Sequence, residues 1–474
     1  MRWSFAALAA RICIALAVSG CSSGNTKDTA AGTGFSPGQP PGRASMALAE
    51  NKKTGREKNA GSLAHPESEP LLPFFFVLKE LESGARETPV NILQIGDSHT
   101  AGDYLSGRLR ELLQNRFGAA GRGFLPPGFP DKYYKPDLIK VTQSAGWLRL
   151  RSTEANSTER FGIAGVAQRS TKPRQRMSIL STEAAGFDHG FVEVLGPARF
   201  SLTFDNAETR EFDISGDAPN GEWIEFDAPA GSQELVLETG NSPVTLLAWG
   251  VQRKGAGILY SNLGTIGAQA KLMGRWDAGI VRSELQHLDP ALILIAFGTN
   301  EAFGERNDLI NFYWDFSDPV AFIAKSAPNA AIVIIGPPDS NRLYRRPAGV
   351  YGDCTDAALS GPPLALAANP AQKKRPFSIV WATPEEVTLV EAEEMRIAAD
   401  HGWYFWDWSA VMGGSCSAHR WSVRNEPLVR PDHIHQTMAG YRFSAELLYR
   451  ELMTGYGRYR KETGISSSLK QTRR

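Results

Sequence analysis

Two short motifs offer the residues needed for acyl-transfer chemistry. Residues 96–99 (Gly-Asp-Ser-His) supply a serine hydroxyl, and residues 432–435 (Asp-His-Ile-His) supply a carboxylate three residues before an imidazole. One loop could hold the second pair, with the carboxylate fixing the ring's tautomer and stabilising the imidazolium formed when serine loses its proton. We therefore predict Ser98 as nucleophile, His435 as general base and Asp432 as the residue that orients His435.

Each motif also has a plainer interpretation. A serine or aspartate at the start of a helix is an ordinary N-cap, and an isolated Asp-x-x-His occurs often by chance. His99 and His433 compete for the role of base, but neither has a carboxylate three residues before it. The prediction therefore depends on whether the fold brings the two motifs together.

A parallel sheet would do so. Several apolar runs have the character of strands covered on both faces: 90–95, 291–297, 331–335 and 403–408. Helical stretches lie between them, the clearest beginning at Thr383, with Glu386 placed as in a capping box, and the last spanning 437–453. Alternating strands and helices predict an α/β domain whose active site lies at the carboxyl ends of its strands. Ser98 directly follows the first strand.

Two further turns on the same edge could complete an oxyanion hole. Asn300 follows the strand at 291–297 and could donate through its side chain. Gly267 follows an expected strand at 257–260 and could donate its backbone N–H, because a glycine permits close approach. The backbone N–H of Ser98 would be the third donor. The alternatives are an Asx turn at Asn300 and a commonplace turn glycine.

Between residues 124 and 255 the pattern changes to short strands separated by turn residues. The expected strands are 191–195, 199–204, 223–226, 234–238 and 244–249. This spacing predicts an all-β domain, a β-sandwich, inserted into the α/β domain. Trp223 and neighbouring aromatic residues are candidates to contact a glycan, and the alternative is that they belong to the core.

The N-terminal residues predict export. Residues 1–20 read as a signal peptide, and Val-Ser-Gly-Cys at 18–21 resembles a bacterial lipobox, which would make Cys21 a lipid anchor to a membrane. An ordinary signal peptide cut nearby is the alternative. Residues 21–68 are expected to form the anchor and a flexible linker, and residues 456–474 a disordered tail.

Composition narrows the partners. The 51 basic and 51 acidic side chains give no net charge, so no field of one sign is available to bind nucleic acid. Outside the signal and anchor only Cys354 and Cys416 remain, and in an oxidising compartment they are expected to form a disulfide, the alternative being two buried thiols. No metal-ligand spacing is present, so we expect neither a metal nor a cofactor.

The four motifs, in this order, resemble those of the SGNH/GDSL hydrolases, named for their Ser, Gly, Asn and His. Residues 96–103 (GDSHTAGD) and 298–303 (GTNEAF) are similar to those of bacterial peptidoglycan O-acetylesterases, which also carry an inserted carbohydrate-module-like β-sandwich. The resemblance implies a three-layer, flavodoxin-like hydrolase domain formed by residues 69–123 and 256–455. It also implies the triad of Ser98, Asp432 and His435 and the oxyanion hole of Ser98, Gly267 and Asn300.

The expected activity is removal of O-acetyl groups from a cell-envelope polysaccharide, peptidoglycan above all, in the periplasm. Because the base must be neutral, activity is expected to fall below about pH 6. An O-acetyltransferase on the same fold and a catalytically silent glycan-binding lipoprotein are the alternatives. The sequence leaves open which acetylated position is the target, which membrane holds the anchor and what the oligomeric state is.

Overall fold

The structure is a computed structural model. It describes residues 66–132, 134–304, 309–347, 354 and 377–464. The expected signal peptide, Cys21 and most of the linker lie outside these ranges. The described residues all belong to one compact unit by their contacts.

The centre of this unit is a largely parallel sheet. Its five parallel strands are β1 (Pro89–Gly96), β13 (Gly257–Gly264), β14 (Leu292–Ala296), β15 (Ala331–Ile335) and β18 (Tyr404–Trp406). They lie in the order β13-β1-β14-β15-β18, with every neighbouring pair parallel. Counted along the chain this is the flavodoxin-like order 2-1-3-4-5, in which ligands bind where the winding reverses, here between β1 and β14.

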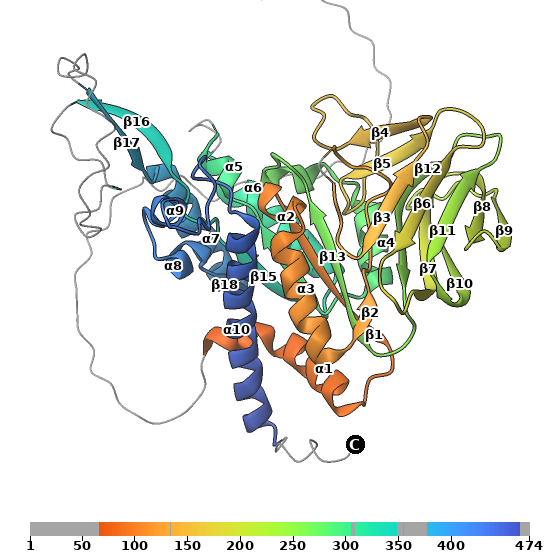
Figure 1. Cartoon of the computed structure of the whole chain (residues 1–474), viewed down its shortest axis with the longest axis horizontal. Helices are drawn as coiled ribbons and strands as arrows, with labels where there is room; N and C mark the ends of the chain where they lie inside the picture. Colours follow the sequence, from red (N-terminus) through yellow and green to blue (C-terminus); the bar gives the residue numbers. More distant parts are fainter. Residues whose placement is uncertain (1–65, 133, 305–308, 348–353, 355–376, 465–474) are drawn as a thin grey trace, which may run out of the picture. The chain divides into compact units, whose positions relative to one another are not determined.

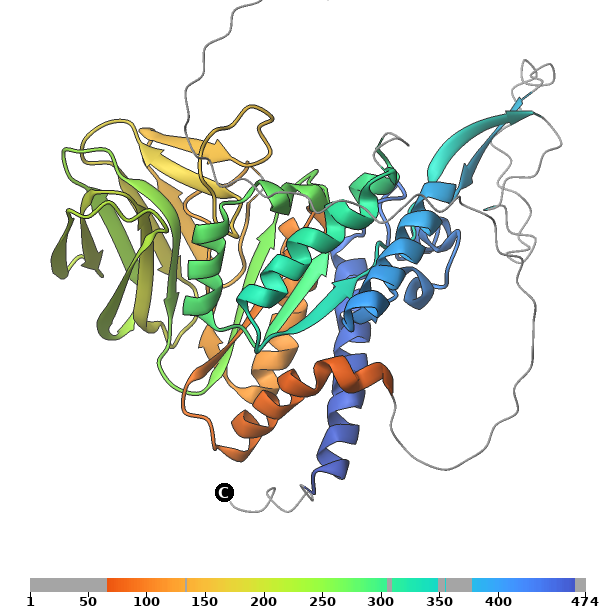
Figure 2. The same cartoon turned by 180° about the vertical axis from the view of Figure 1, so that it is seen from behind.

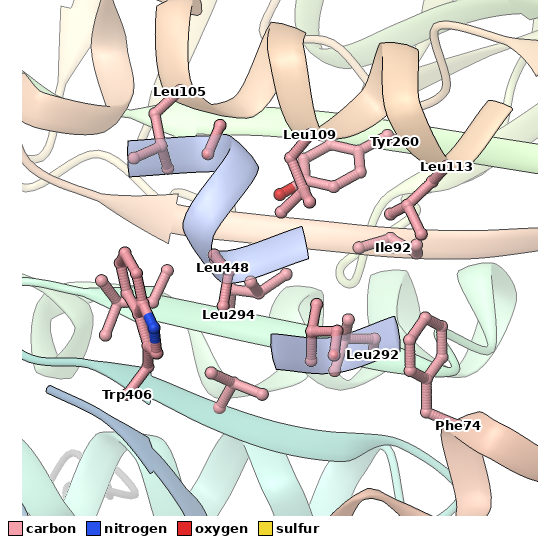
Figure 3. Close-up of a cluster of buried hydrophobic side chains, with 14 of the residues drawn as sticks. Phe74, Ile92, Leu105, Leu109, Leu113, Tyr260, Leu292, Leu294, Trp406 and Leu448 are labelled. Atoms are coloured by element: carbon pink, nitrogen blue, oxygen red, sulfur yellow. The ribbon is translucent and has the colours of Figure 1, made fainter. Parts of the chain in front are cut away.

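Helices cover both faces of this sheet (Figures 1 and 2). One face carries α1 (Leu72–Ser83), α3 (Tyr104–Phe117) and α10 (Met438–Glu462), and the other carries α4 (Ala278–Leu288), α6 (Phe312–Ser326) and α7 (Glu385–His401). Strand residues alternate between the two cores: Ile92 packs with the first set and Leu93 with the second. Figure 3 shows the first core, where Leu105, Leu109 and Leu113 of α3 meet the sheet. The mixed α/β class is confirmed.

The segment expected as an insertion consists of antiparallel strands. One group comprises β4 (Trp147–Arg151), β5 (Val166–Ser170), β12 (Thr245–Gln252), β7 (Phe187–Leu195) and β10 (Glu222–Ser232). The second sheet comprises β3 (Ile139–Gln143), β6 (Arg176–Ser181), β11 (Glu234–Thr239), β8 (Ala198–Phe204) and β9 (Glu208–Ile214). Buried side chains of both groups, such as Val192 and Leu202, form one cluster.

The first antiparallel group is continuous with the parallel sheet. The short strand β2 (Ala119–Gly121) pairs with β12 on one side and with β13 on the other, so that one sheet of eleven strands results. Sequence patterning gave no sign of this link, because a three-residue strand of Ala-Ala-Gly carries no periodicity.

The remaining elements are short. They are the 3-10 helices η1 (Pro66–Leu71) and η2 (Ala270–Arg275), the helices α2 (Ser98–Ala101), α5 (Thr299–Ala302), α8 (Trp408–Met412) and α9 (Ser417–Ser422), and the hairpin of β16 (Arg342–Pro347) and β17 (Phe377–Ala382). Helices α2 and α5 directly follow β1 and β14 and so lie at the carboxyl edge of the sheet.

Two helix boundaries differ from the predictions. Thr383 does not cap α7, whose N-cap is Pro384, because the Thr383 hydroxyl instead donates to the buried Asp339 carboxylate at 2.7 Å. Helix α10 does not end near residue 453 but continues to Glu462, through the start of the expected tail. The cause is tertiary: Tyr456 is fully buried and donates to Glu82 of α1 at 2.7 Å.

Candidate active site

Ser98 is the first residue of α2, directly after β1. The Asp97 side chain caps this helix by accepting from the backbone N–H of His99 at 2.8 Å. The Ser98 hydroxyl is half-buried, and its backbone N–H belongs to a helical first turn, where N–H groups have no intrahelical acceptor. Glycine is required at position 96, since a Cβ there would lie 2.5 Å from the Ala296 carbonyl oxygen. The glycine therefore allows β14 and the first turn of α2 to approach the backbone directly before the serine.

His435 reaches Ser98 from the loop before α10. Its Nε2 lies 3.1 Å from the Ser98 Oγ, and its Nδ1 lies 3.0 Å from the Asp432 Oδ2. The structure thus brings the three residues together, although Ser98 and His435 are 337 positions apart in the chain. Their order, hydroxyl to imidazole to carboxylate, is the arrangement by which a base activates a serine nucleophile.

Asp432 is held by the backbone of its own loop. Its Oδ1 accepts from the N–H groups of Ile434 and His435, both at 2.9 Å. Although partial burial raises the pKa of Asp432, the hydrogen bonds from His435 and from these N–H groups hold it below its usual range. The carboxylate therefore stays ionised and orients the imidazole.

The two competing histidines are engaged elsewhere. The Nδ1 of His99 lies 2.9 Å from the Tyr441 hydroxyl, and burial lowers the pKa of His99 to about 3. The Nε2 of His433 lies 2.9 Å from the Ser422 hydroxyl, and burial lowers its pKa to about 4. Both rings are neutral at pH 7, and among the described residues only His435 is hydrogen-bonded to Ser98.

Asn300 and Gly267 lie at the same sheet edge. Gly96 pairs with both Gly264 and Ala296, so the turns after β1, β13 and β14 begin side by side. The Asn300 amide donates to the Ala268 carbonyl at 2.9 Å and to the Asp97 carboxyl at 3.3 Å. Both of its hydrogens are therefore engaged. Gly267 is exposed, in a turn where its φ is 74°. Within the described residues, no hydrogen bond joins Gly267 to Ser98.

Three buried carboxyls lie beneath these turns. Burial raises the pKa of Asp97 to about 8 and that of Glu301 to about 7. Burial, together with the nearby Glu301 and Asp97, raises the pKa of Glu394 well above its usual value. Glu301 accepts from the backbone N–H of Gly298 at 3.0 Å and so fixes the turn that carries Asn300. This support could not be inferred from the motif alone.

A polar network holds the loops around His435. The buried Asp339 carboxylate accepts from the Ala418 N–H at 2.8 Å as well as from Thr383, and the Asn341 N–H donates to the His433 carbonyl at 2.8 Å. A disulfide joins Cys354 to Cys416, immediately before α9.

A second buried network fixes α3 beneath the serine turn. The Asp103 carboxylate accepts from Arg110 at 3.1 Å and from Arg122 at 3.0 Å, and all three side chains are almost fully buried. It also accepts from Asn262 of β13 at 3.2 Å. Although burial raises the pKa of Asp103, the two arginines hold it well below its usual range. The network ties the Ser98 turn to the neighbouring strand.

Trp223 does not lie on a free face. Its ring stacks on His287 of α4 at 3.9 Å and contacts Phe191 at 4.9 Å, so it packs the antiparallel part against the α/β part. Trp223 therefore belongs to the core, which was the alternative to a glycan contact.

Within the described ranges, no group of three or more metal-ligating side chains is placed to hold an ion. No helix there combines the length and apolar content needed to cross a membrane.

Comparison with known proteins gives a solved structure of high similarity. A structure described as a peptidoglycan O-acetylesterase in action is 26% identical, with a TM-score of 0.64, and the match covers 81% of this chain and 96% of that one. A family two carbohydrate esterase from Clostridium thermocellum in complex with cellohexaose is 11% identical over 66% of this chain and 99% of that one, but its TM-score is 0.28. No family model and no curated protein matches.

The fold and the comparison define the class of protein: the chain is a carboxylic ester hydrolase, related to the hydrolases of the SGNH type. Within that class it is a relative of the peptidoglycan O-acetylesterase, to which it is 26% identical over the 81% of this chain that the match covers. The resemblance carried by the sequence motifs is confirmed.

Proposed function

We propose that the protein is a serine esterase that removes O-acetyl groups from a cell-envelope polysaccharide, with peptidoglycan as the principal substrate. The observation that carries the proposal is the hydrogen-bonded series from Ser98 through His435 to Asp432, with distances of 3.1 and 3.0 Å. Similarity to a peptidoglycan O-acetylesterase supports the substrate class.

In the proposed mechanism, the Ser98 Oγ attacks the acetyl carbonyl while its proton moves to the His435 Nε2. The tetrahedral intermediate collapses, the C–O bond to the sugar breaks, and the sugar oxygen takes the proton from His435. Water then attacks the acetyl-serine and gives its proton to His435, the C–O bond to Ser98 breaks, the Ser98 Oγ takes that proton back, and acetate leaves. Asp432 stabilises the imidazolium in both halves of the reaction.

The oxyanion of each intermediate would be held by the N–H groups of Ser98 and Gly267 and by the Asn300 amide. Asn300 can take this role by giving up its longer hydrogen bond, the one of 3.3 Å to Asp97. Because the pKa of Asp97 is raised to about 8, its carboxyl is predominantly neutral at pH 7 and holds that amide less strongly than a carboxylate would. The hydrogen bond from the Asn300 amide to the Ala268 carbonyl can remain.

The test is acetate release from O-acetylated peptidoglycan by the wild type and by Ser98→Ala, with and without an acceptor glycan. Ser83→Ala, which removes an exposed hydroxyl from α1, is the matched control. Release into water that requires Ser98 is expected. Transfer to the acceptor with little free acetate would favour an acetyltransferase, and release unaffected by Ser98→Ala would overturn the assignment.

We further propose that residues 124–255 form a β-sandwich module. The support is that buried side chains of its two antiparallel groups form one cluster, with Trp249 and Phe200 among them. An experimental structure in which these two groups do not face each other would contradict this architecture.

We also propose that the protein is an exported lipoprotein anchored through Cys21 in the periplasm. The support is the lipobox-like sequence at residues 18–21. Metabolic labelling with a radioactive fatty acid should mark the wild type and not Cys21→Ala. Labelling that persists in Cys21→Ala would exclude this anchor.

A further inference from the structure

A cavity of about 290 Å³ adjoins the turn that carries Gly267. Its wall includes residues 263–266, at the end of β13, together with β4, the start of β5 and the loop around residue 130. The backbone N–H of Thr265 donates to the Gly96 carbonyl at 2.8 Å, two residues before Ser98. The cavity therefore shares a wall with the proposed acyl site.

The charged side chains of this cavity are predominantly basic. Arg149 and Arg151 lie two residues apart on β4 and so project from the same face of the strand. Lys132 and Asp131 also line the cavity, which leaves three basic side chains against one acidic one. This excess is local, because the whole chain has no net charge.

Both guanidinium groups can engage a ligand. Arg149 forms no ion pair with any described residue, and its one direct hydrogen bond there is a long one of 3.4 Å to the Phe129 carbonyl. Arg151 pairs with Glu154 at 3.2 Å, but both side chains are about half exposed, and such pairs contribute little. The planar fork of arginine matches the geometry of a carboxylate.

Apart from Thr153 and Thr265, the rest of the wall is built of apolar and glycine residues, with Val166, Leu263 and Ile266 among them. A ligand with a carboxylate on a short aliphatic stem would satisfy both kinds of surface. We propose that this cavity binds a carboxylate of the glycan substrate, held by Arg149 and Arg151, and so favours acetylated sugars that bear an acidic substituent. The proposal rests on the proposed function, because it assigns a subsite to the same substrate.

Binding, measured without turnover, tests the proposal. Ser98→Ala in the full chain is titrated calorimetrically with the disaccharide of N-acetylglucosamine and N-acetylmuramic acid, and with the same disaccharide in which the lactyl carboxylate is a neutral amide. The acid is expected to bind about tenfold more tightly, the size of one charge-assisted hydrogen bond at a half-exposed site. Adding Arg149→Gln should remove the difference, and Arg149→Lys, which keeps the charge but not the fork, should retain part of it.

The matched control is Arg199→Gln, on β8 in the other sheet and outside the cavity wall, which should leave the tenfold difference intact. A third ligand is the same disaccharide with its stem peptide, compared with a form in which the peptide carboxylates are neutral amides. If only this pair shows a difference in affinity that Arg149→Gln removes, the bound carboxylate comes from the peptide and the cavity is still its site. Equal binding of acid and amide for both the disaccharide and the peptide-bearing ligand, or a difference that survives Arg149→Gln, would overturn the proposal. Failure of the esterase function itself would be seen separately, as absent acetate release with carboxylate-dependent binding intact.

Discussion

Replacing Asp432 by asparagine should inactivate the protein through the tautomer of His435. In the wild type the Asp432 Oδ1 accepts from two backbone N–H groups at 2.9 Å, and the Oδ2 faces the His435 Nδ1 at 3.0 Å. An asparagine has only one oxygen to place. Directing it to the backbone satisfies two donors, whereas directing it to the ring satisfies one and sets the amide N–H groups against the two backbone donors.

The orientation with the amide oxygen directed to the two backbone N–H groups should therefore be favoured, and the asparagine N–H will face the ring Nδ1. Nδ1 must then accept, so the proton sits on Nε2 and points at the Ser98 hydroxyl, where the ring cannot act as base. The corresponding change in serine proteases lowers kcat by about 10⁴, or about 5.5 kcal/mol. Because the Asp432 side chain is 45% exposed and water can compete, we expect a loss of about 10³.

The assay is kcat for 4-nitrophenyl acetate, with Ser98→Ala as the blank. Asp432→Ala is the matched comparison: it imposes no donor on Nδ1, so its loss should be smaller than that of Asp432→Asn. Nitrogen-15 shifts of His435 should show the proton on Nε2 in Asp432→Asn and on Nδ1 in the wild type. An asparagine variant more active than the alanine variant, or with the wild-type tautomer, would refute this reasoning.

Three further predictions concern stability. Asp103→Asn leaves two buried arginines without their carboxylate, and urea unfolding should show a loss of about 3–5 kcal/mol, whereas an unchanged midpoint would mean that the arginines find other partners. The double variant Cys354→Ala, Cys416→Ala removes a bond spanning 62 positions and should lose about 4 kcal/mol on the chain-entropy estimate, checked against the wild type with and without reductant. Burial raises the pKa of Glu284 and of its neighbour Glu193, so the stability present below about pH 4 should decline as the pH rises through the folded-state values. Glu284→Gln should flatten that decline in thermal melts between pH 5 and 9, and a slope as steep as that of the wild type would contradict the assignment.

Local sequence was sufficient for the elements on which the motifs lie. Uninterrupted apolar runs mark β14 and β15, and a predominantly apolar run marks β1, because strands buried on both faces contain little else. Glycine and proline mark their ends. Ser98 and Asn300 could therefore be placed at one sheet edge, and Asp432 could be paired with His435 by spacing alone.

What sequence could not supply is the partner of each polar side chain. Thr383 has the spacing of a helix cap, but its hydroxyl is used by Asp339, 44 residues away. The strands β3 and β4 (IKVTQ and WLRLR) mix charge with apolar residues and went unpredicted. Arg149 and Arg151 lie on one of them, and only the fold shows that they adjoin the turn that carries Gly267.

The central position of β1 has a consequence for the synthesis of the chain. Both of its neighbours, β13 and β14, come later in the sequence, and Pro89 pairs with Gly257. About 170 residues must therefore leave the ribosome before β1 can be paired, a delay of roughly 10 to 30 s at about 5–20 residues per second. The antiparallel strands made in the meantime have partners close by in sequence, as with β8 and β9. The strand that presents the proposed nucleophile is thus among the first made, and for that interval both of its backbone edges are unpaired and open to aggregation.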